Sequence, residues 1–321
     1  MKGKNEVVLL TGASSGIGLA TAVFLAERRY RVHAGIRNPD KQHNLINEVD
    51  RKKLPISIVY FDILNNPSIE KAISEILRKE GRIDVLINNA GYGLRGFFED
   101  CSMEEMKMQF DTNFFGTMSM IKHVLPVMRK QNYGRIINVS SIYAEFPFPM
   151  MSVYSATKFA IEAITSALRL ELFPFNIQVS TIQPSGIRTN FEQSAVFSKE
   201  SREEHSPYFK FNKHFIEKFS MDSAGLSPDI VAAKIYKIIR SANNKIVLID
   251  NFIDESVLDL FTKRKTGVEF IIYTKNITKL TALDAHKFSQ QYGNVQLKEF
   301  NQSHDRFLII DNKDVYILGR Q

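Results

Sequence analysis

The chain has 321 residues, a length that suits about two domains of roughly 150 residues each. Hydrophobic residues make up 44% and charged residues 24%, and no apolar run approaches the roughly 20 residues that cross a bilayer, so we expect no membrane-spanning segment. The net charge is +7 without a dense run of lysine and arginine, which favours a phosphate-rich cofactor over a nucleic acid as the reason for the basic character.

The first part of the chain alternates short apolar runs with amphipathic stretches. The apolar runs predict strands at 7–10, 31–36, 57–61, 85–87, 135–139 and 178–182. Between them we predict helices at 16–28, 41–51, 68–79, 103–129 and 153–172. This alternation predicts an α/β fold, a doubly wound parallel sheet of the Rossmann type with helices on both faces.

Residues 190–223 interrupt the alternation with a mixed polar and aromatic segment. A long irregular segment after the last strand of such a sheet is typical of a lid or binding loop. A further helix is predicted to start at Ser227-Pro228, because serine is a good N-cap and proline suits the first helical position.

A polar break at 241–244 precedes what we predict to be a second, smaller and incomplete α/β unit. Its predicted strands cover 245–249, 268–273, 295–300, 307–310 and 315–318, with helices at 255–263 and 281–290. Residues 245–249 could instead form a seventh, edge strand of the first sheet. We favour a division into domains 1–243 and 244–321.

A glycine-rich loop, Thr11 to Gly18, follows the first predicted strand and opens the first predicted helix. Glycines allow the backbone to approach a pyrophosphate, and the helix N-terminus offers free N–H groups and a favourable dipole. A lone glycine pattern is weak evidence, but the context of strand, loop and helix predicts a dinucleotide site.

Tyr154 and Lys158 stand four residues apart on a predicted helix and therefore share one face of it. An ammonium group beside a phenol favours the phenolate and lowers the pKa of the tyrosine. Such a tyrosine can give or take a proton near neutral pH. The pair therefore predicts acid–base chemistry beside the dinucleotide.

These motifs together resemble the short-chain dehydrogenase/reductase family over residues 4 to about 242. The matching segments are Thr-Gly-x-x-x-Gly-Ile-Gly at 11–18, Asn-Asn-Ala-Gly at 88–91, Asn113, Ser141 thirteen residues before Tyr154, Tyr-x-x-x-Lys at 154–158 and Pro184 to Thr189. Ser185 departs from the family pattern, which has glycine directly after the proline.

The resemblance implies roles for individual residues. Tyr154 would be the acid/base, Lys158 would lower its pKa and hold the nicotinamide ribose, Ser141 would bind the substrate oxygen, and Asn113 would hold a water linked to Lys158. Ser140 is expected to be structural. The cofactor would contact the residues Gly12, Ser14, Ser15, Gly16, Ile17, Gly18, Arg37, Asp62, Ile63, Asn89, Ala90, Gly91, Tyr154, Lys158, Pro184, Ile187 and Thr189.

The end of the second strand bears on the choice of cofactor. An acidic residue there would bind the 2′-hydroxyl of NAD, but the chain has Arg37, which suits the 2′-phosphate of NADP. Asp40 comes later and is expected to cap the next helix. We therefore expect NADP, with NAD as the second choice, and no metal.

Apolar residues surround the catalytic segment, among them Phe146, Phe148, Met150, Met151 and Phe191. They resemble the branch of the family that includes hydroxysteroid and retinol dehydrogenases, and imply an apolar alcohol or carbonyl substrate. Packing in the core or at a subunit interface is the alternative explanation for each of them. The resemblance also implies a homodimer or homotetramer that pairs through helices 103–129 and 153–172.

Cys101 is the only cysteine, so no intrachain disulfide can form and we expect a cytoplasmic protein. The segment from Ser303 to Asp311, with His304 and Arg306, resembles part of a phospholipase D-like motif. It implies a truncated phospholipase D-like unit at 244–321, similar to the C-terminal part of phage-type regulatory proteins. The alternative function is therefore a phosphodiesterase or nucleic-acid-binding protein that acts through this segment.

Overall fold

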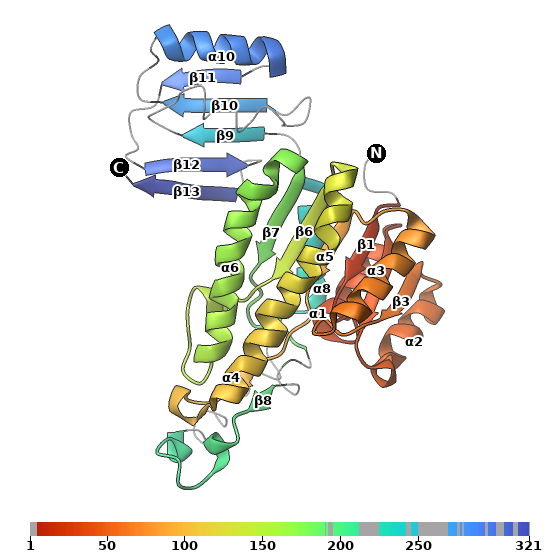
Figure 1. The fold of residues 1–321 in the computed structure, drawn as a ribbon. Coiled ribbons are helices and arrows are strands. Elements are labelled where there is room, and N and C mark those ends of the chain that lie inside the picture. The colour runs from red at the N-terminus through yellow and green to blue at the C-terminus, as the bar shows by residue number, and fades with distance from the viewer. Residues whose placement is uncertain are drawn as a thin grey trace.

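A computed structural model gives the fold of the chain (Figure 1). The structure describes residues 5–189, 191, 195–211, 225–241, 245–249, 269–274, 277, 279–292, 295–299, 305–310 and 314–320.

A six-stranded parallel sheet forms the centre of the first unit. Its strands are β1 (Val7–Leu10), β2 (Arg31–Ile36), β3 (Ile56–Tyr60), β4 (Val85–Asn88), β6 (Gly134–Val139) and β7 (Ile177–Ile182). They lie in the order β3-β2-β1-β4-β6-β7, and every neighbouring pair is parallel. The order reverses at β1, and ligands of doubly wound sheets bind outside the carboxyl ends of the strands at such a point. The predicted fold class is confirmed.

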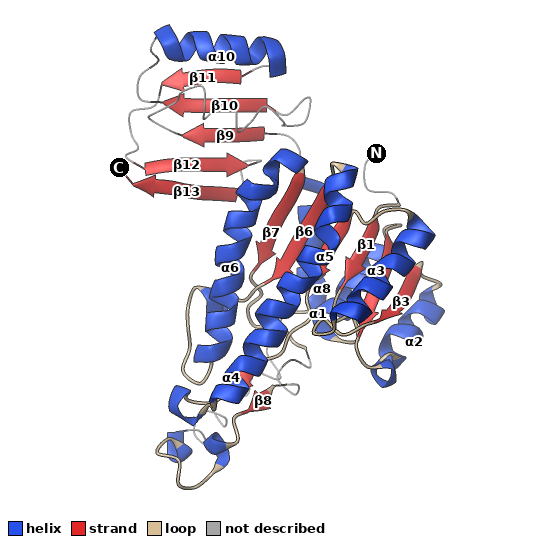
Figure 2. Cartoon of the chain, in the orientation of Figure 1, coloured by secondary structure: helices blue, strands red, loops and turns tan. Residues whose placement is uncertain are grey.

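Helices cover both faces of this sheet (Figure 2). On one face lie α1 (Gly16–Ala26), α2 (His43–Lys52) and α8 (Pro228–Ser241), and on the other lie α3 (Asn66–Glu80), α5 (Gly116–Gln131) and α6 (Ser152–Leu172). Successive residues of β1 point to opposite faces, and all four are fully buried because both faces are covered. This explains why the strand sequences are continuously apolar.

The predicted long helix over 103–129 is present, but it is not regular throughout. The segment consists of α4 (Met103–Phe110), a π-helical turn (Asp111–Phe115) and α5. In the turn, Asn113 Oδ1 accepts a hydrogen bond from Tyr92 N at 3.1 Å, and Asn113 Nδ2 donates to Tyr92 O at 2.9 Å. The helical periodicity of the sequence does not reveal this local widening, because it depends on contacts with the loop after β4.

A second sheet contains β9 (Lys245–Ile249), β10 (Glu269–Thr274), β11 (Val295–Glu299), β12 (Asp305–Ile310) and β13 (Asp314–Arg320), with the helix α10 (Lys279–Tyr292). The order is β11-β10-β9-β12-β13, and β9 pairs with β10 in parallel and with β12 in antiparallel orientation. In the part of the chain that the structure describes, β9 thus belongs to the second sheet. The predicted helix at 255–263 lies outside the described residues, and the division into two domains stays a prediction.

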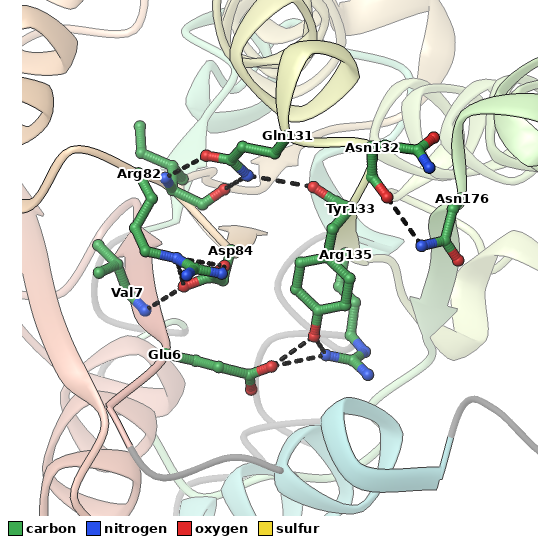
Figure 3. Close-up of polar contacts among 10 residues, drawn as sticks. Glu6, Val7, Arg82, Asp84, Gln131, Asn132, Tyr133, Arg135 and Asn176 are labelled. Carbon is green, nitrogen blue, oxygen red and sulfur yellow. Dashed lines mark hydrogen bonds and ion pairs between the residues drawn. The ribbon is translucent and has the colours of Figure 1, made fainter. Parts of the chain in front are cut away.

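The amino edge of the six-stranded sheet holds a buried network of charged side chains (Figure 3). Asp84 is fully buried and accepts hydrogen bonds from Val7 N at 2.8 Å and from Arg82 Nε at 2.8 Å. Arg135 donates to Glu6 at 3.1 Å, and the hydroxyl of Tyr133 donates to the same carboxylate. The network joins the starts of β1, β4 and β6.

Candidate active site

A large cavity of about 1110 Å³ lies at the carboxyl edge of the sheet. It is lined by loops that follow β1, β2, β3, β4, β6 and β7. Its volume exceeds that of a usual pocket for one small ligand, so it has room for a dinucleotide and a substrate together. Among the predicted site residues, those that line it are Gly12, Ser14, Ser15, Gly16, Ile17, Arg37, Asp62, Ile63, Asn89, Ala90, Gly91, Ser141, Tyr154, Lys158, Pro184, Ile187 and Thr189.

The glycine loop and the loop after β4 are bound tightly to each other. Thr11 Oγ1 accepts hydrogen bonds from the backbone N–H groups of Asn89 and Ala90, each at 3.0 Å. Asn89 Nδ2 donates to Gly12 O at 2.9 Å. Gly12 has a left-handed φ of +68°, and a Cβ there would lie 2.8 Å from Ala90 Cα. A side chain at position 12 would therefore push the two loops apart.

The N-terminus of α1 fits the phosphates of a dinucleotide. Ser15 stands at the N-cap without a side-chain capping bond, and the first turn contains no acidic residue. The first N–H groups of the helix therefore face the cavity without a capping side chain, and they favour an anion. Gly18 does not line the cavity: a Cβ there would lie 2.1 Å from Gly12 O. Its role is close packing of the loop, which corrects the prediction of direct contact.

Three polar residues at the end of β2 line the cavity, Arg37, Asn38 and Lys41. The sequence analysis singled out only Arg37. Asn38 caps the following turn by accepting a hydrogen bond from Asp40 N at 2.9 Å, so the expected capping role of Asp40 is wrong. Two exposed cations, Arg37 and Lys41, thus lie at this end of the cavity. The position of Lys41 four residues after Arg37 could have indicated the second cation from the sequence.

The helix α6 carries Tyr154 into the opposite part of the cavity. Tyr154 is 5% exposed, and burial raises its pKa to about 12, while a hydrogen bond with Ser141 acts in the opposite direction. Lys158 Nζ lies 5.6 Å from the centroid of the Tyr154 ring. In this structure burial outweighs the hydrogen bond with Ser141, so the pKa of Tyr154 is raised where the sequence led us to expect a lowering. The phenol stays protonated at neutral pH, the form that can donate a proton.

Lys158 lies one turn after Tyr154 on the same helix, α6, and its side chain is buried. Its Nζ donates to Val139 O at 2.8 Å, at the end of β6. Burial lowers its pKa to about 8, and Glu162 one turn later acts against this shift. A buried ammonium with a lowered pKa is typical of functional sites.

Asn113 does not reach the cavity. It is 1% exposed, and its amide is used on Tyr92 and, at 3.4 Å, on Thr157 Oγ1. The structure thus places Asn113 behind the site, where it fixes the loop after β4. The implied water between Asn113 and Lys158 stays a prediction.

The segment after β7 closes the cavity on another side. Gly186 has a φ of +56°, and Ile187 pairs with Leu226 just before α8. Arg188 N donates to Leu226 O at 2.9 Å, which fixes the turn even though Ser185 replaces the glycine of the family pattern. Arg188 also lines the cavity and was not predicted, since nothing in the sequence distinguished it from a surface arginine.

Aromatic and methionine side chains surround Tyr154. Phe148, Met150, Met151 and Phe191 line the cavity as the sequence suggested, and Tyr143 joins them. The missed Tyr143 stands two residues after Ser141 and contacts the Tyr154 ring edge-on, with centroids 6.2 Å apart. Phe146, which the sequence also suggested, does not line the cavity and is 66% exposed.

Comparison with known proteins shows the family of the chain. The pattern described as short chain dehydrogenase matches residues 6–200. A 3-ketodihydrosphingosine reductase of Bacteroides thetaiotaomicron is 38% identical over 240 residues, which cover 74% of this chain and 85% of that protein. Retinol dehydrogenase 8 of Bos taurus is 34% identical over 247 residues, covering 74% of this chain and 78% of that protein. The chain therefore belongs to the short-chain dehydrogenase family.

Solved structures support the same class. A 3-ketoacyl-(acyl-carrier-protein) reductase from Brucella melitensis complexed with NADH has a TM-score of 0.61 and 25% identity, covering 74% of this chain and 91% of that chain. An actinorhodin polyketide ketoreductase with NADPH has a TM-score of 0.62 and 28% identity, covering 73% of this chain and 90% of that chain. The protein is an NAD(P)-dependent oxidoreductase.

The end of the chain gains no such support. The family match stops at residue 200, and neither the fold nor these comparisons support a phospholipase D-like unit at 244–321. His304 lies outside the described residues. Among the helices that the structure describes, none is long and apolar enough to cross a membrane.

Proposed function

We propose that the protein is an NADP-dependent oxidoreductase that interconverts an apolar carbonyl compound and its alcohol, with Tyr154 as the acid/base. One observation carries this proposal: Tyr154, Ser141 and Lys158 line the same cavity as the glycine loop and the N-terminus of α1. The nicotinamide cofactor supplies the hydride when it is bound. The residues of the chain supply the proton and hold the oxygen of the substrate.

The roles of the three side chains follow from their environment. In the direction of reduction, the protonated Tyr154 hydroxyl donates its proton to the substrate oxygen, and Ser141 donates a hydrogen bond to that oxygen. Lys158 places a positive charge near the phenolate that remains. The apolar surroundings of the tyrosine exclude water, which strengthens each of these interactions.

The test is an absorbance assay that follows NADPH consumption with a panel of apolar ketones and aldehydes. We expect turnover by the parent protein and loss of turnover in Tyr154→Phe, which lacks the hydroxyl that carries the proton. NADPH binding by the variant, followed by fluorescence, should be retained. Turnover at the parent rate by Tyr154→Phe would falsify the role of this tyrosine.

The preference for NADP is supported by the two cations at the end of β2. Arg37 and Lys41 line the cavity there, and both suit a 2′-phosphate. We expect Arg37→Asp to shift the preference toward NAD by about tenfold or more, because a charge-assisted hydrogen bond contributes roughly 1.5–3 kcal/mol. Fluorescence titration of both cofactors measures this, with Arg29→Asp outside the cavity as the charge-matched control. An unchanged preference removes Arg37 from the cofactor site.

We also propose a homodimer or homotetramer. Large apolar side chains on the outer surfaces of α4, the π-helical turn and α6 are exposed: Met108, Phe115, Phe159 and Leu170. An exposed apolar surface of this kind is typical of an interface. Light scattering that shows a stable monomer contradicts this assembly.

A further inference from the structure

Two side chains of the cavity, Met151 and Phe191, contact a glycine that lies behind them. A Cβ added at Gly93 would lie 3.3 Å from two carbons of the Phe191 ring and 3.7 Å from Met151 Cε. Met151 and Phe191 line the cavity, whereas Gly93 does not. The approach to Phe191 is tight and that to Met151 is an ordinary van der Waals contact, so the missing side chain of Gly93 limits the position of Phe191.

We refer to Met151 and Phe191 together as the wall of the substrate site. Phe191 lies directly against the proposed catalytic residue Tyr154. The ring centroids of Phe191 and Tyr154 are 5.7 Å apart, with the planes inclined by 56°. On another side of Tyr154 stands Tyr143, which stacks on Phe148 with centroids 6.2 Å apart. A substrate whose oxygen reaches Tyr154 must therefore place a substituent against Phe191 and Met151.

Backbone hydrogen bonds hold the wall in place from both sides. Gly96 N donates to Met150 O at 3.0 Å, and Val196 N donates to Gly93 O at 2.9 Å. Met150 has a φ of +64°, a left-handed conformation that is strained for a residue with a side chain. Such strain persists where the surrounding contacts fix it, and it is concentrated at functional sites.

We propose that Met151 and Phe191, the latter positioned by Gly93, are the specificity-determining residues of the substrate site, and that they bind a long apolar substituent on the carbonyl carbon. The proposal rests on the oxidoreductase function above. A thioether and a phenyl ring cannot replace the hydrogen bonds of a polar substituent, so such a group would lose its water without compensation. An alkyl chain instead gains from burial against them.

The test compares 2-butanone with 2-decanone in the NADPH assay. For the parent protein we expect kcat/KM to rise about fourfold for each methylene that the wall buries. In Gly93→Ala the added methyl group displaces the Phe191 ring by a few tenths of an ångström, and kcat/KM for 2-decanone should fall by up to about tenfold relative to 2-butanone. Phe191→Ala, which removes part of the wall without crowding, should reduce the preference for the longer ketone.

Phe98→Ala serves as the matched control, because Phe98 is 67% exposed and does not line the cavity. NADPH affinity, titrated by fluorescence, should be the same in all variants and shows that they are folded. Equal kcat/KM for both ketones in the parent protein, or an unchanged preference in both Gly93→Ala and Phe191→Ala, contradicts the proposal that Met151 and Phe191 determine specificity. If a parent protein that binds NADPH turns over no ketone, the result contradicts the proposed carbonyl reduction. The proposed specificity role of Met151 and Phe191 is then contradicted as well, because it depends on that function.

Discussion

The carboxyl edge and the amino edge of the six-stranded sheet each hold a tyrosine next to a buried basic side chain, and Tyr154 is buried whereas Tyr133 is half-buried. At the amino edge, the Arg135 guanidinium lies 5.1 Å from the centroid of the Tyr133 ring, and Glu6 accepts hydrogen bonds from both residues. At the carboxyl edge, Lys158 Nζ lies 5.6 Å from the centroid of the Tyr154 ring and donates a hydrogen bond to the backbone carbonyl of Val139. The first pair has a carboxylate partner, and the second lines a cavity.

This difference separates a structural use of buried charge from a chemical one. A buried charge that is paired and hydrogen-bonded holds segments of the chain together, but removing one partner leaves the other uncompensated. A buried ammonium that keeps no carboxylate partner costs stability and has a shifted pKa. The amino edge therefore fixes the sheet, while the carboxyl edge retains groups that can interact with ligands.

Exchanging the two tyrosines for phenylalanine should give the largest contrast. Tyr154→Phe should lower kcat by about 100- to 10,000-fold, the usual range for a lost acid/base, with little change in stability. Tyr133→Phe should leave kcat of the folded protein near that of the parent but lower the free energy of unfolding, because Glu6 loses a donor. Kinetics and chemical denaturation of both variants measure this, and similar activity losses in the two would break the comparison.

The Arg82–Asp84 pair should give the largest loss of stability. Arg82→Ala leaves the fully buried Asp84 carboxylate without its charged partner, and an uncompensated buried charge costs up to about 3–5 kcal/mol. Asp84→Ala should cost less, about 1–3 kcal/mol, because it leaves the buried Val7 N–H unsatisfied while the Arg82 side chain is 49% exposed and can be solvated in part. Urea denaturation measures both. An Arg82→Ala variant as stable as the parent contradicts the structural role of the network.

Lys158→Met should remove activity and yet stabilise the fold. The pKa of Lys158 falls from its ordinary 10.5 to about 8 in the folded protein, which corresponds to a penalty of about 3 kcal/mol for the charged form. Loss of the hydrogen bond to Val139 O destabilises the variant by about 1 kcal/mol, so its free energy of unfolding should exceed that of the parent by about 2 kcal/mol at neutral pH.

The sign of this effect depends on pH in a defined way. Between about pH 8 and 10.5 the unfolded chain binds more protons at Lys158 than the folded one, so the stability of the parent rises with pH there. The advantage of Lys158→Met should therefore be full below pH 8 and vanish above 10.5. Thermal denaturation across this range checks it, and a variant less stable than the parent at pH 7 would show that the buried ammonium is well compensated.

The smallest expected effect is in the pH profile of carbonyl reduction. kcat/KM should decline above about pH 8, as Lys158 loses the charge that stabilises the developing phenolate. In Lys158→Arg the guanidinium stays charged, so the decline should move to higher pH even if the rate is lower. An identical inflection in the two proteins assigns it to another group.

The sequence by itself determined the central sheet and the residues that we propose to be catalytic. The strands of the first unit read as short apolar runs because both faces of each strand are buried, and this pattern depends on neighbouring residues only. The positions of Gly12, Ser141, Tyr154 and Lys158 followed from motifs whose spacing is itself local. All four indeed line one cavity.

The tertiary structure determined the burial, the pKa values and the contacts of those residues. Burial, which no motif reveals, raises the pKa of Tyr154 where the sequence predicted a lowering, and it lowers that of Lys158. Asn113 turned away from the cavity and Gly18 became a packing residue because of contacts with the loops after β4 and β1. Desolvation and contacts of this kind join residues far apart in the chain, so they exist only once the sheet has brought its loops together.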